Sequence, residues 1–174
     1  FVKDLLNNSD NAYGQTIWTS YYKGIANANI AIAKIPEIKM DETTKLKLIG
    51  EAKFMRAYYY FNLVRIFGNI PLTLEPIDLT SEDLYAPASN PEDVYNQIVL
   101  DLKDAEGAGL PMRETTGRAS LGAVKSLLSS VYLTMAGYPL QKGTEYYSLA
   151  AAKSKEVIDS GVFSLFTSYD DLHN

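Results

Sequence analysis

Apolar residues recur about every three to four positions along most of this chain, which is the spacing that lets a helix bury one face. The pattern predicts five helices, over residues 13–33, 42–67, 91–106, 121–136 and 144–160. Three of them follow residues that cap helix N-termini well, Asp41, Asn90 and Ser120, and glycine or proline follows the helix ends. No stretch approaches the roughly 18 consecutive apolar residues of a membrane-spanning helix. We expect an all-α protein.

The helix predicted over residues 42–67 has the largest apolar surface. On a helical wheel its inner stripe consists of Leu48, Ala52, Met55, Tyr59, Leu63 and Ile66. The later half of this helix is apolar almost all round, so we expect it to be packed between neighbours at the centre of the domain. Arg56 lies at the edge of the stripe, where a charge needs a partner. We expect an ion pair there, or hydrogen bonds from the guanidinium to backbone carbonyls.

Two later helices carry patterns that indicate helix pairing. The helix over residues 121–136 has small side chains that let a neighbour approach closely, among them Ala123, Ser126 and Ser129. The helix over residues 144–160 is expected to turn Tyr147, Ala150 and Ile158 inward. Long paired helices with small contact residues predict an irregular stack similar to tetratricopeptide (TPR) repeats, although the regular repeat of about 34 residues is absent.

The segment 72–89 interrupts the helical pattern. It contains Pro76 and Pro87 and several polar residues, and it shows no periodicity. A connection of this length is uncommon inside a compact domain, and such loops are often functional.

Composition limits the chemistry that this chain can perform. The net charge of −5 argues against a nucleic-acid partner, which needs a basic face. Cysteine is absent and the single histidine is His173, so the common metal sites and nucleophilic triads cannot be built. We predict no catalytic residues, no metal and no cofactor. An all-α glycoside hydrolase remains the enzyme alternative, because a pair of carboxylates that meet only in space cannot be excluded from sequence.

Nine of the 13 tyrosines fall into two groups. One group lies on predicted inner helix faces, where a ring packs and its hydroxyl finds a partner: Tyr21, Tyr22, Tyr59, Tyr95 and Tyr132. The other group lies in or beside irregular segments, where a flat ring can stack on a sugar: Tyr13, Tyr85, Tyr138 and Tyr169.

Several stretches of the chain resemble the SusD/RagB family. Residues 50–64 read GEAKFMRAYYYFNLV and are followed at 67–72 by FGNIPL, which is similar to the hallmark of that family. Three more stretches match in the family's order: WTSYYKGIANAN at 18–29, GRASLGA at 117–123 and AAKSKEVIDSG at 151–161. Together these matches cover nearly the whole chain.

The resemblance implies a TPR-like scaffold on a lipid-anchored protein at the outer-membrane surface of Bacteroidota. Such proteins capture glycans, or peptides in some branches, for a TonB-dependent transporter of the SusC type, and they make or break no bond. We expect residues 1–174 to form a single TPR-like domain, a fragment of a longer SusD-like protein that lacks the signal and lipobox N-terminus and the variable C-terminal part. A TPR-type protein-interaction module is the alternative.

Candidate ligand-binding residues lie at the entrance of the first helix and in the long loop. Asn11, Tyr13 and Trp18 combine an amide with aromatic rings near a helix entrance, and Tyr85 lies in the proline-rich segment. Ligand-contacting aromatics vary between members of the family, so the resemblance does not match these positions residue by residue. They stand as a hypothesis.

Overall fold

The structure is a computed structural model that describes residues 12–78, 80, 85–165 and 168. The described residues form five α-helices, α1 (Ala12–Lys34), α2 (Glu42–Phe67), α3 (Pro91–Glu106), α4 (Leu121–Ala136) and α5 (Thr144–Asp159), and a short 3₁₀ helix η2 (Ile35–Glu37). Two short strands, β1 (Ile70–Pro71) and β2 (Ala88–Ser89), pair in antiparallel fashion. The predicted helices and the all-α fold class are confirmed. No described helix has the length and apolar character to cross a membrane.

The predicted caps fix three of the helix starts. The side chain of Asp41 accepts a hydrogen bond from the Thr44 amide at 2.9 Å, and Asn90 accepts one from the Asp93 amide at 3.0 Å. Ser120 accepts a longer bond from the amide three residues on, at 3.2 Å. Each bond satisfies an amide group that has no partner within the helix, which is why the chain begins a helix there.

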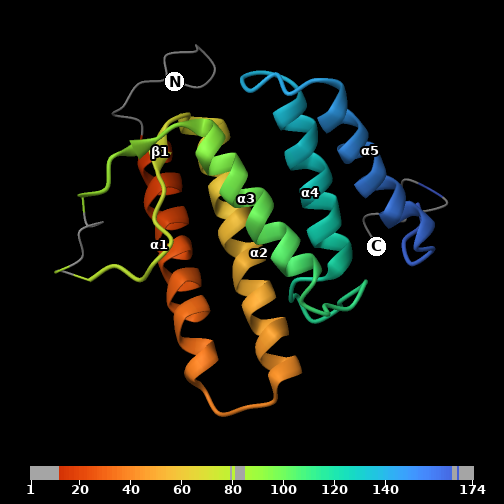
Figure 1. Ribbon diagram of the computed structural model, residues 1–174, viewed down its shortest axis with the longest axis horizontal. Coiled ribbons are helices and arrows are strands. Elements are labelled where there is room, and N and C mark those ends of the chain that lie inside the picture. Colours follow the sequence, from red (N-terminus) through yellow and green to blue (C-terminus); the bar gives the residue numbers. More distant parts are fainter. Residues whose placement is uncertain (1–11, 79, 81–84, 166–167, 169–174) are drawn as a thin grey trace.

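Successive helices pack side by side and run up and down, so that the stack grows in chain order from α1 to α5 (Figure 1). The core runs through the middle of this stack and includes fully buried side chains such as Leu63, Val94, Ile98 and Leu128. This arrangement is the TPR-like fold predicted from the sequence. It brings the C-terminus of α2, the N-terminus of α3 and the C-terminus of α4 to the same end as the N-terminus of α1 (Figure 1).

The buried face of α2 differs from the predicted stripe. Leu63 is fully buried as expected, but Met55 and Ile66 are exposed. The buried side chains of the later half are instead Arg56, Ala57, Tyr60, Phe61, Leu63 and Val64. Because α2 packs against α1 on one side and α3 on the other, its buried face is set by two neighbours and not by a single stripe. The prediction that α2 is packed between neighbours is confirmed.

The prediction for the inner face of α5 is correct at one of its three residues. Ala150 is buried against α4, where the Ser129 hydroxyl donates to its carbonyl at 2.8 Å, so the small-residue contact predicted for α4 is confirmed at Ser129. Tyr147 and Ile158 are exposed, contrary to the prediction. The extensive contacts of α5 with other described elements are with α4, so only one side of α5 is covered.

Candidate functional site

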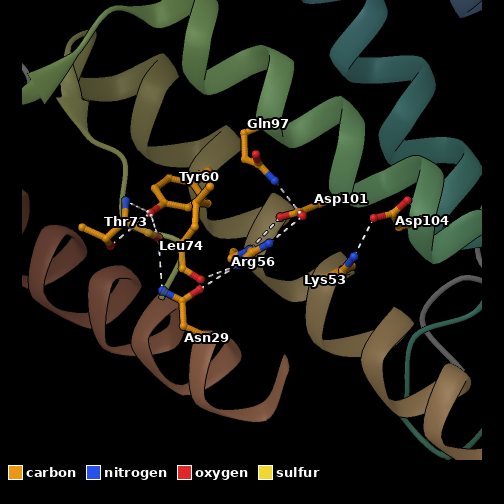
Figure 2. A network of polar contacts seen from close by, with 9 residues as sticks. All are labelled: Asn29, Lys53, Arg56, Tyr60, Thr73, Leu74, Gln97, Asp101 and Asp104. Carbon is orange, nitrogen blue, oxygen red and sulfur yellow. Dashed lines mark hydrogen bonds and ion pairs between the residues drawn. The ribbon is translucent and has the colours of Figure 1, made fainter. Parts of the chain in front are cut away.

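A buried polar network joins α1, α2 and α3 (Figure 2). Arg56 of α2 holds Asp101 of α3 in a two-pronged ion pair, with Nε–Oδ2 and Nη2–Oδ1 distances of 2.7 Å. The two side chains are only 6% and 1% exposed. Nη1 of Arg56 also donates to Asn29 Oδ1 at 2.9 Å and to the Leu74 carbonyl at 3.0 Å. The expectation that Arg56 is paired is confirmed in both of its forms, an ion pair and a bond to a backbone carbonyl.

The same network holds the chain that follows β1 against the helices. Asn29 Nδ2 donates to the carbonyls of Thr73 and Glu75, both at 3.1 Å. The Tyr60 hydroxyl donates to the Thr73 carbonyl at 2.7 Å and accepts from the Thr73 amide at 2.8 Å, and the Tyr22 hydroxyl donates to the Pro71 carbonyl at 2.7 Å. These side chains supply partners to backbone groups that helix or sheet bonds leave unmatched. Burial raises the pKa of both tyrosines.

A pocket of about 440 Å³ opens beside this network. Four charged side chains that line it are paired with each other: Arg56 with Asp101, and Lys53 with Asp104 at 2.5 Å (Figure 2). Gln97 also donates to Asp101, at 3.0 Å. These four charges already have protein partners, and Glu75 is the remaining charged side chain among the described residues that line the pocket.

The described residues contain no group of three or more His, Cys, Asp or Glu side chains that could hold a metal ion. The oxygens of the most deeply buried carboxylate, Asp101, are occupied by Arg56 and Gln97. Asp101 is therefore placed to bind the scaffold together and not to act on a ligand.

The four candidate ligand-binding residues have different surroundings. Tyr13, in the first turn of α1, is 77% exposed, and Tyr85 is 89% exposed. Trp18 is half-buried, and its ring lies 4.8 Å from Tyr22 and 5.1 Å from Phe67, so it packs the start of α1 against the end of α2. Asn11 lies outside the described residues. Within the described part, no ring contact joins Tyr85 to Tyr13 or Trp18.

A second pocket of about 420 Å³ lies at the end of the stack where α2 ends and α3 begins. Arg65, Tyr95, Thr134 and Tyr138 line it, and Tyr138 is 85% exposed. Sequence reasoning singled out Tyr138 as a tyrosine beside an irregular segment but placed Tyr95 in the core. The tertiary contact between three helix ends creates this pocket, and no local pattern encodes that contact.

Comparison with known proteins gives a consistent family. Residues 2–133 match the model of a SusD-like family described as "Starch-binding associating with outer membrane". A SusD-like protein of Bacteroides ovatus is 31% identical over 161 residues, which cover 89% of this chain and 29% of the relative. SusD-like protein P38 of Formosa agariphila is 36% identical over 110 residues, covering 60% of this chain and 21% of the relative.

Solved structures share the architecture. A SusD superfamily protein from Parabacteroides distasonis superposes with a TM-score of 0.92 and 42% identity, over 97% of this chain and 36% of that protein. A laminarin-binding SusD-like protein gives a TM-score of 0.80 and 34% identity, over 90% and 34% of the two chains. A protein solved with a xylogluco-oligosaccharide gives 0.83 and 29%, over 95% and 33%. This chain thus spans less than two fifths of the length of each relative.

Proposed function

We propose, since this chain belongs to the SusD-like family, that it is part of a cell-surface protein that binds a glycan and leaves it chemically unchanged. The observation that carries the proposal is the family match over residues 2–133. Two proteins with the same helical stack, one laminarin-binding and one solved with a xylogluco-oligosaccharide, support it. When the protein is incubated with a panel of polysaccharides, at least one should bind, and none should be cleaved to shorter products.

We further propose that the full protein sits at the outer membrane through a lipid anchor and hands its ligand to a TonB-dependent transporter of the SusC type. The support is the family description, which names association with the outer membrane, and the resemblance of residues 50–72 to the family hallmark. A lipobox cysteine upstream of Phe1 and a neighbouring transporter gene would agree with this role. A cytoplasmic start codon shortly before Phe1 would contradict it.

Residues 1–174 are proposed to form a single helical domain of a longer SusD-like protein. The relatives support this division, because the chain covers 29% of the Bacteroides ovatus protein and 36% of the Parabacteroides distasonis structure. Because the chain covers only this share of its relatives, binding is measured on the full-length protein.

Within this chain, Asn11, Tyr13, Trp18 and Tyr85 remain the proposed ligand contacts. Tyr13 and Tyr85 carry most of the proposal, because both rings are exposed and an aromatic face is the common platform for a sugar ring. We expect Tyr13→Ala or Tyr85→Ala to weaken glycan binding about tenfold in calorimetric titration of the full-length protein.

Tyr58→Ala is the matched control, because Tyr58 is an exposed tyrosine on α2 whose ring contacts Tyr59. If neither Tyr13→Ala nor Tyr85→Ala changes the affinity while the glycan still binds, the site assignment fails and the function stands. If no glycan in a broad panel binds, the function itself is wrong.

A further inference from the structure

The pocket at the end of α2 has the dimensions of a small-ligand site. Its volume of about 420 Å³ lies within the range of roughly 300–1,000 Å³ that such sites occupy. Val64, Pro91 and Pro139 give it apolar walls, and none of the described residues that line it is acidic. Apolar walls with a few polar groups are the usual composition of a binding pocket.

One polar group in this pocket belongs to an otherwise buried side chain. Tyr95 is 2% exposed, and its ring packs edge-on against Phe61 with the centroids 6.2 Å apart. Among the described residues its hydroxyl has no hydrogen-bond partner. Every fully buried side-chain oxygen or nitrogen of the described residues does have a partner, so the Tyr95 hydroxyl is not fully buried. The hydroxyl therefore opens to solvent, and the pocket that Tyr95 lines is the opening. Burial raises the pKa of Tyr95, so at neutral pH the hydroxyl is a proton donor.

A fixed positive charge also lines the pocket. The Arg65 guanidinium lies 4.1 Å above the Phe61 ring, Nε donates to the Phe61 carbonyl at 3.2 Å, and Nη2 donates to Asn62 Oδ1 at 2.8 Å. These contacts hold the group in place and use only part of its donor capacity. Within the described part of the chain, Arg65 has no carboxylate partner. Its charge lies near enough to Tyr95 to oppose the rise in the pKa of that hydroxyl.

The rim of the pocket supplies a flat aromatic face. The side chain of Tyr138 is 85% exposed and precedes Pro139, which lines the same pocket. A tyrosine ring loses little conformational freedom when a ligand stacks on it, because it has only two side-chain torsions. Thr134 adds a hydroxyl that already donates to the Ser130 carbonyl at 2.9 Å, so its oxygen is left to accept.

We propose that this pocket is a subsite for one acidic sugar unit, a hexuronate, within the glycan. The pyranose ring stacks on Tyr138, its carboxylate binds Arg65, and the Tyr95 hydroxyl donates to a ring substituent. A guanidinium without a counter-ion favours a carboxylate through charge-assisted hydrogen bonds, which a neutral sugar cannot supply. The inference rests on the proposed glycan-binding function and adds the class of sugar that one subsite accepts.

The test compares uronate oligosaccharides with their methyl esters, which keep the ring and remove the charge. We expect the full-length protein to bind the acid about tenfold more tightly than the ester in calorimetric titration, a difference of about 1.4 kcal/mol, because only the acid offers Arg65 a charged acceptor. Raising the salt concentration should reduce this preference. Arg65→Gln should abolish it, Tyr138→Ala should weaken acid and ester alike, and Tyr95→Phe should weaken both by a smaller factor. Tyr58→Ala is the control and should change neither.

The outcomes separate the subsite from the function. If the protein binds neutral glycans but prefers no acid over its ester, and Arg65→Gln has no effect, the acidic subsite is wrong and the glycan-binding function stands. If no oligosaccharide of either kind binds, the proposed function fails and the subsite fails with it. If Arg65→Gln lowers acid binding with unchanged circular dichroism and an unchanged ester affinity, the subsite is supported.

Discussion

The centre of the helical stack and the end where α2 finishes both combine an arginine of α2 with tyrosines, but they use them differently. At the centre, Arg56 and Tyr60 donate to protein groups, and their partners hold the chain after β1 in place. At the end, Arg65 keeps donor capacity, and Tyr95 and Tyr138 direct a hydroxyl and a ring toward solvent. The same kinds of side chain therefore stabilise the scaffold where protein groups accept their hydrogen bonds. They are available to a ligand where no protein group does.

The hallmark-like segment, residues 50–72, contributes to both regions, with Arg56 and Tyr60 at the centre and Arg65 at the end. It supplies Arg56 and Tyr60 to the central network, and the chain that the network anchors follows it at residues 73–75. Within this segment Arg56 and Tyr60 are buried and bonded inside the protein, whereas Tyr58 is exposed. Substitutions in the two regions should separate stability from affinity.

The largest difference in the free energy of unfolding is expected between alanine variants of the two arginines of α2, Arg56 and Arg65. Arg56→Ala leaves Asp101 buried without its partner and should lower the free energy of unfolding by about 3–5 kcal/mol. Arg65→Ala removes an exposed stack on Phe61 and should cost about 1 kcal/mol or less. Denaturant titration of the full-length protein measures both. Equal losses would mean that the buried ion pair has no special role in the scaffold.

Two apolar side chains of α2 test which face is buried. Leu63→Ala should destabilise by about 2–5 kcal/mol because it leaves a cavity in the core. Ile66→Ala should stay within about 0.5 kcal/mol of the parent, because Ile66 is exposed. The wheel had placed both residues on one inner stripe. If denaturant titration shows comparable losses in the free energy of unfolding, both residues are buried, and the buried face of α2 seen in the structure is wrong.

The hydroxyls of two tyrosines provide a finer comparison. Tyr60→Phe leaves the buried Thr73 amide without its partner, while the Thr73 carbonyl keeps its bond from Asn29, and should cost about 1–3 kcal/mol. Tyr138→Phe keeps the exposed ring and should be neutral in stability. The midpoint of thermal unfolding measures the stability of both variants. If Tyr60→Phe is as stable as the parent, the Tyr60 hydroxyl does not stabilise the scaffold.

The same buried hydroxyl predicts a dependence on alkaline pH. Burial raises the pKa of Tyr60 and Tyr22 above the unfolded value of about 10. Above that pH the unfolded chain has released protons that the folded chain retains, so the free energy of unfolding falls as pH rises toward the raised pKa values. Stability from these groups is complete below about pH 10. Tyr60→Phe should show a shallower alkaline loss in denaturant titrations between about pH 8 and 11, and an identical slope would argue against this origin.

The helices could be predicted from sequence because their determinants are local. Asp41, Asn90 and Ser120 cap the helix that each precedes, and the apolar spacing marks the rest. The need for a partner at Arg56 could also be predicted, since a charge beside an apolar stripe must be neutralised. The identity of that partner could not, because Asp101 is 45 positions further along the chain and meets Arg56 only through helix packing.

The ligand-facing groups depend even more on tertiary structure. The tyrosine at position 95 was predicted to be core, and its ring is buried, but its hydroxyl opens into a pocket between three helix ends. Arg65 gave no sequence signal, because nothing in its neighbourhood showed that it would lack a carboxylate. Tyr13 and Tyr85 are exposed as a ligand contact requires, and their role remains a prediction.

The smallest stability effect is expected where the affinity effect is largest. Tyr13→Ala, Tyr85→Ala and Tyr138→Ala each remove a ring that is at least 77% exposed, so the free energy of unfolding should change by no more than about 0.5 kcal/mol. The same variants should weaken glycan binding in calorimetric titration, because their rings face solvent where a sugar can stack. Such a ring contributes to affinity and not to stability, whereas the buried Tyr60 contributes to stability. A variant that loses stability and affinity in proportion would show that its ring belongs to the scaffold, and the separation of the two regions would fail at that residue.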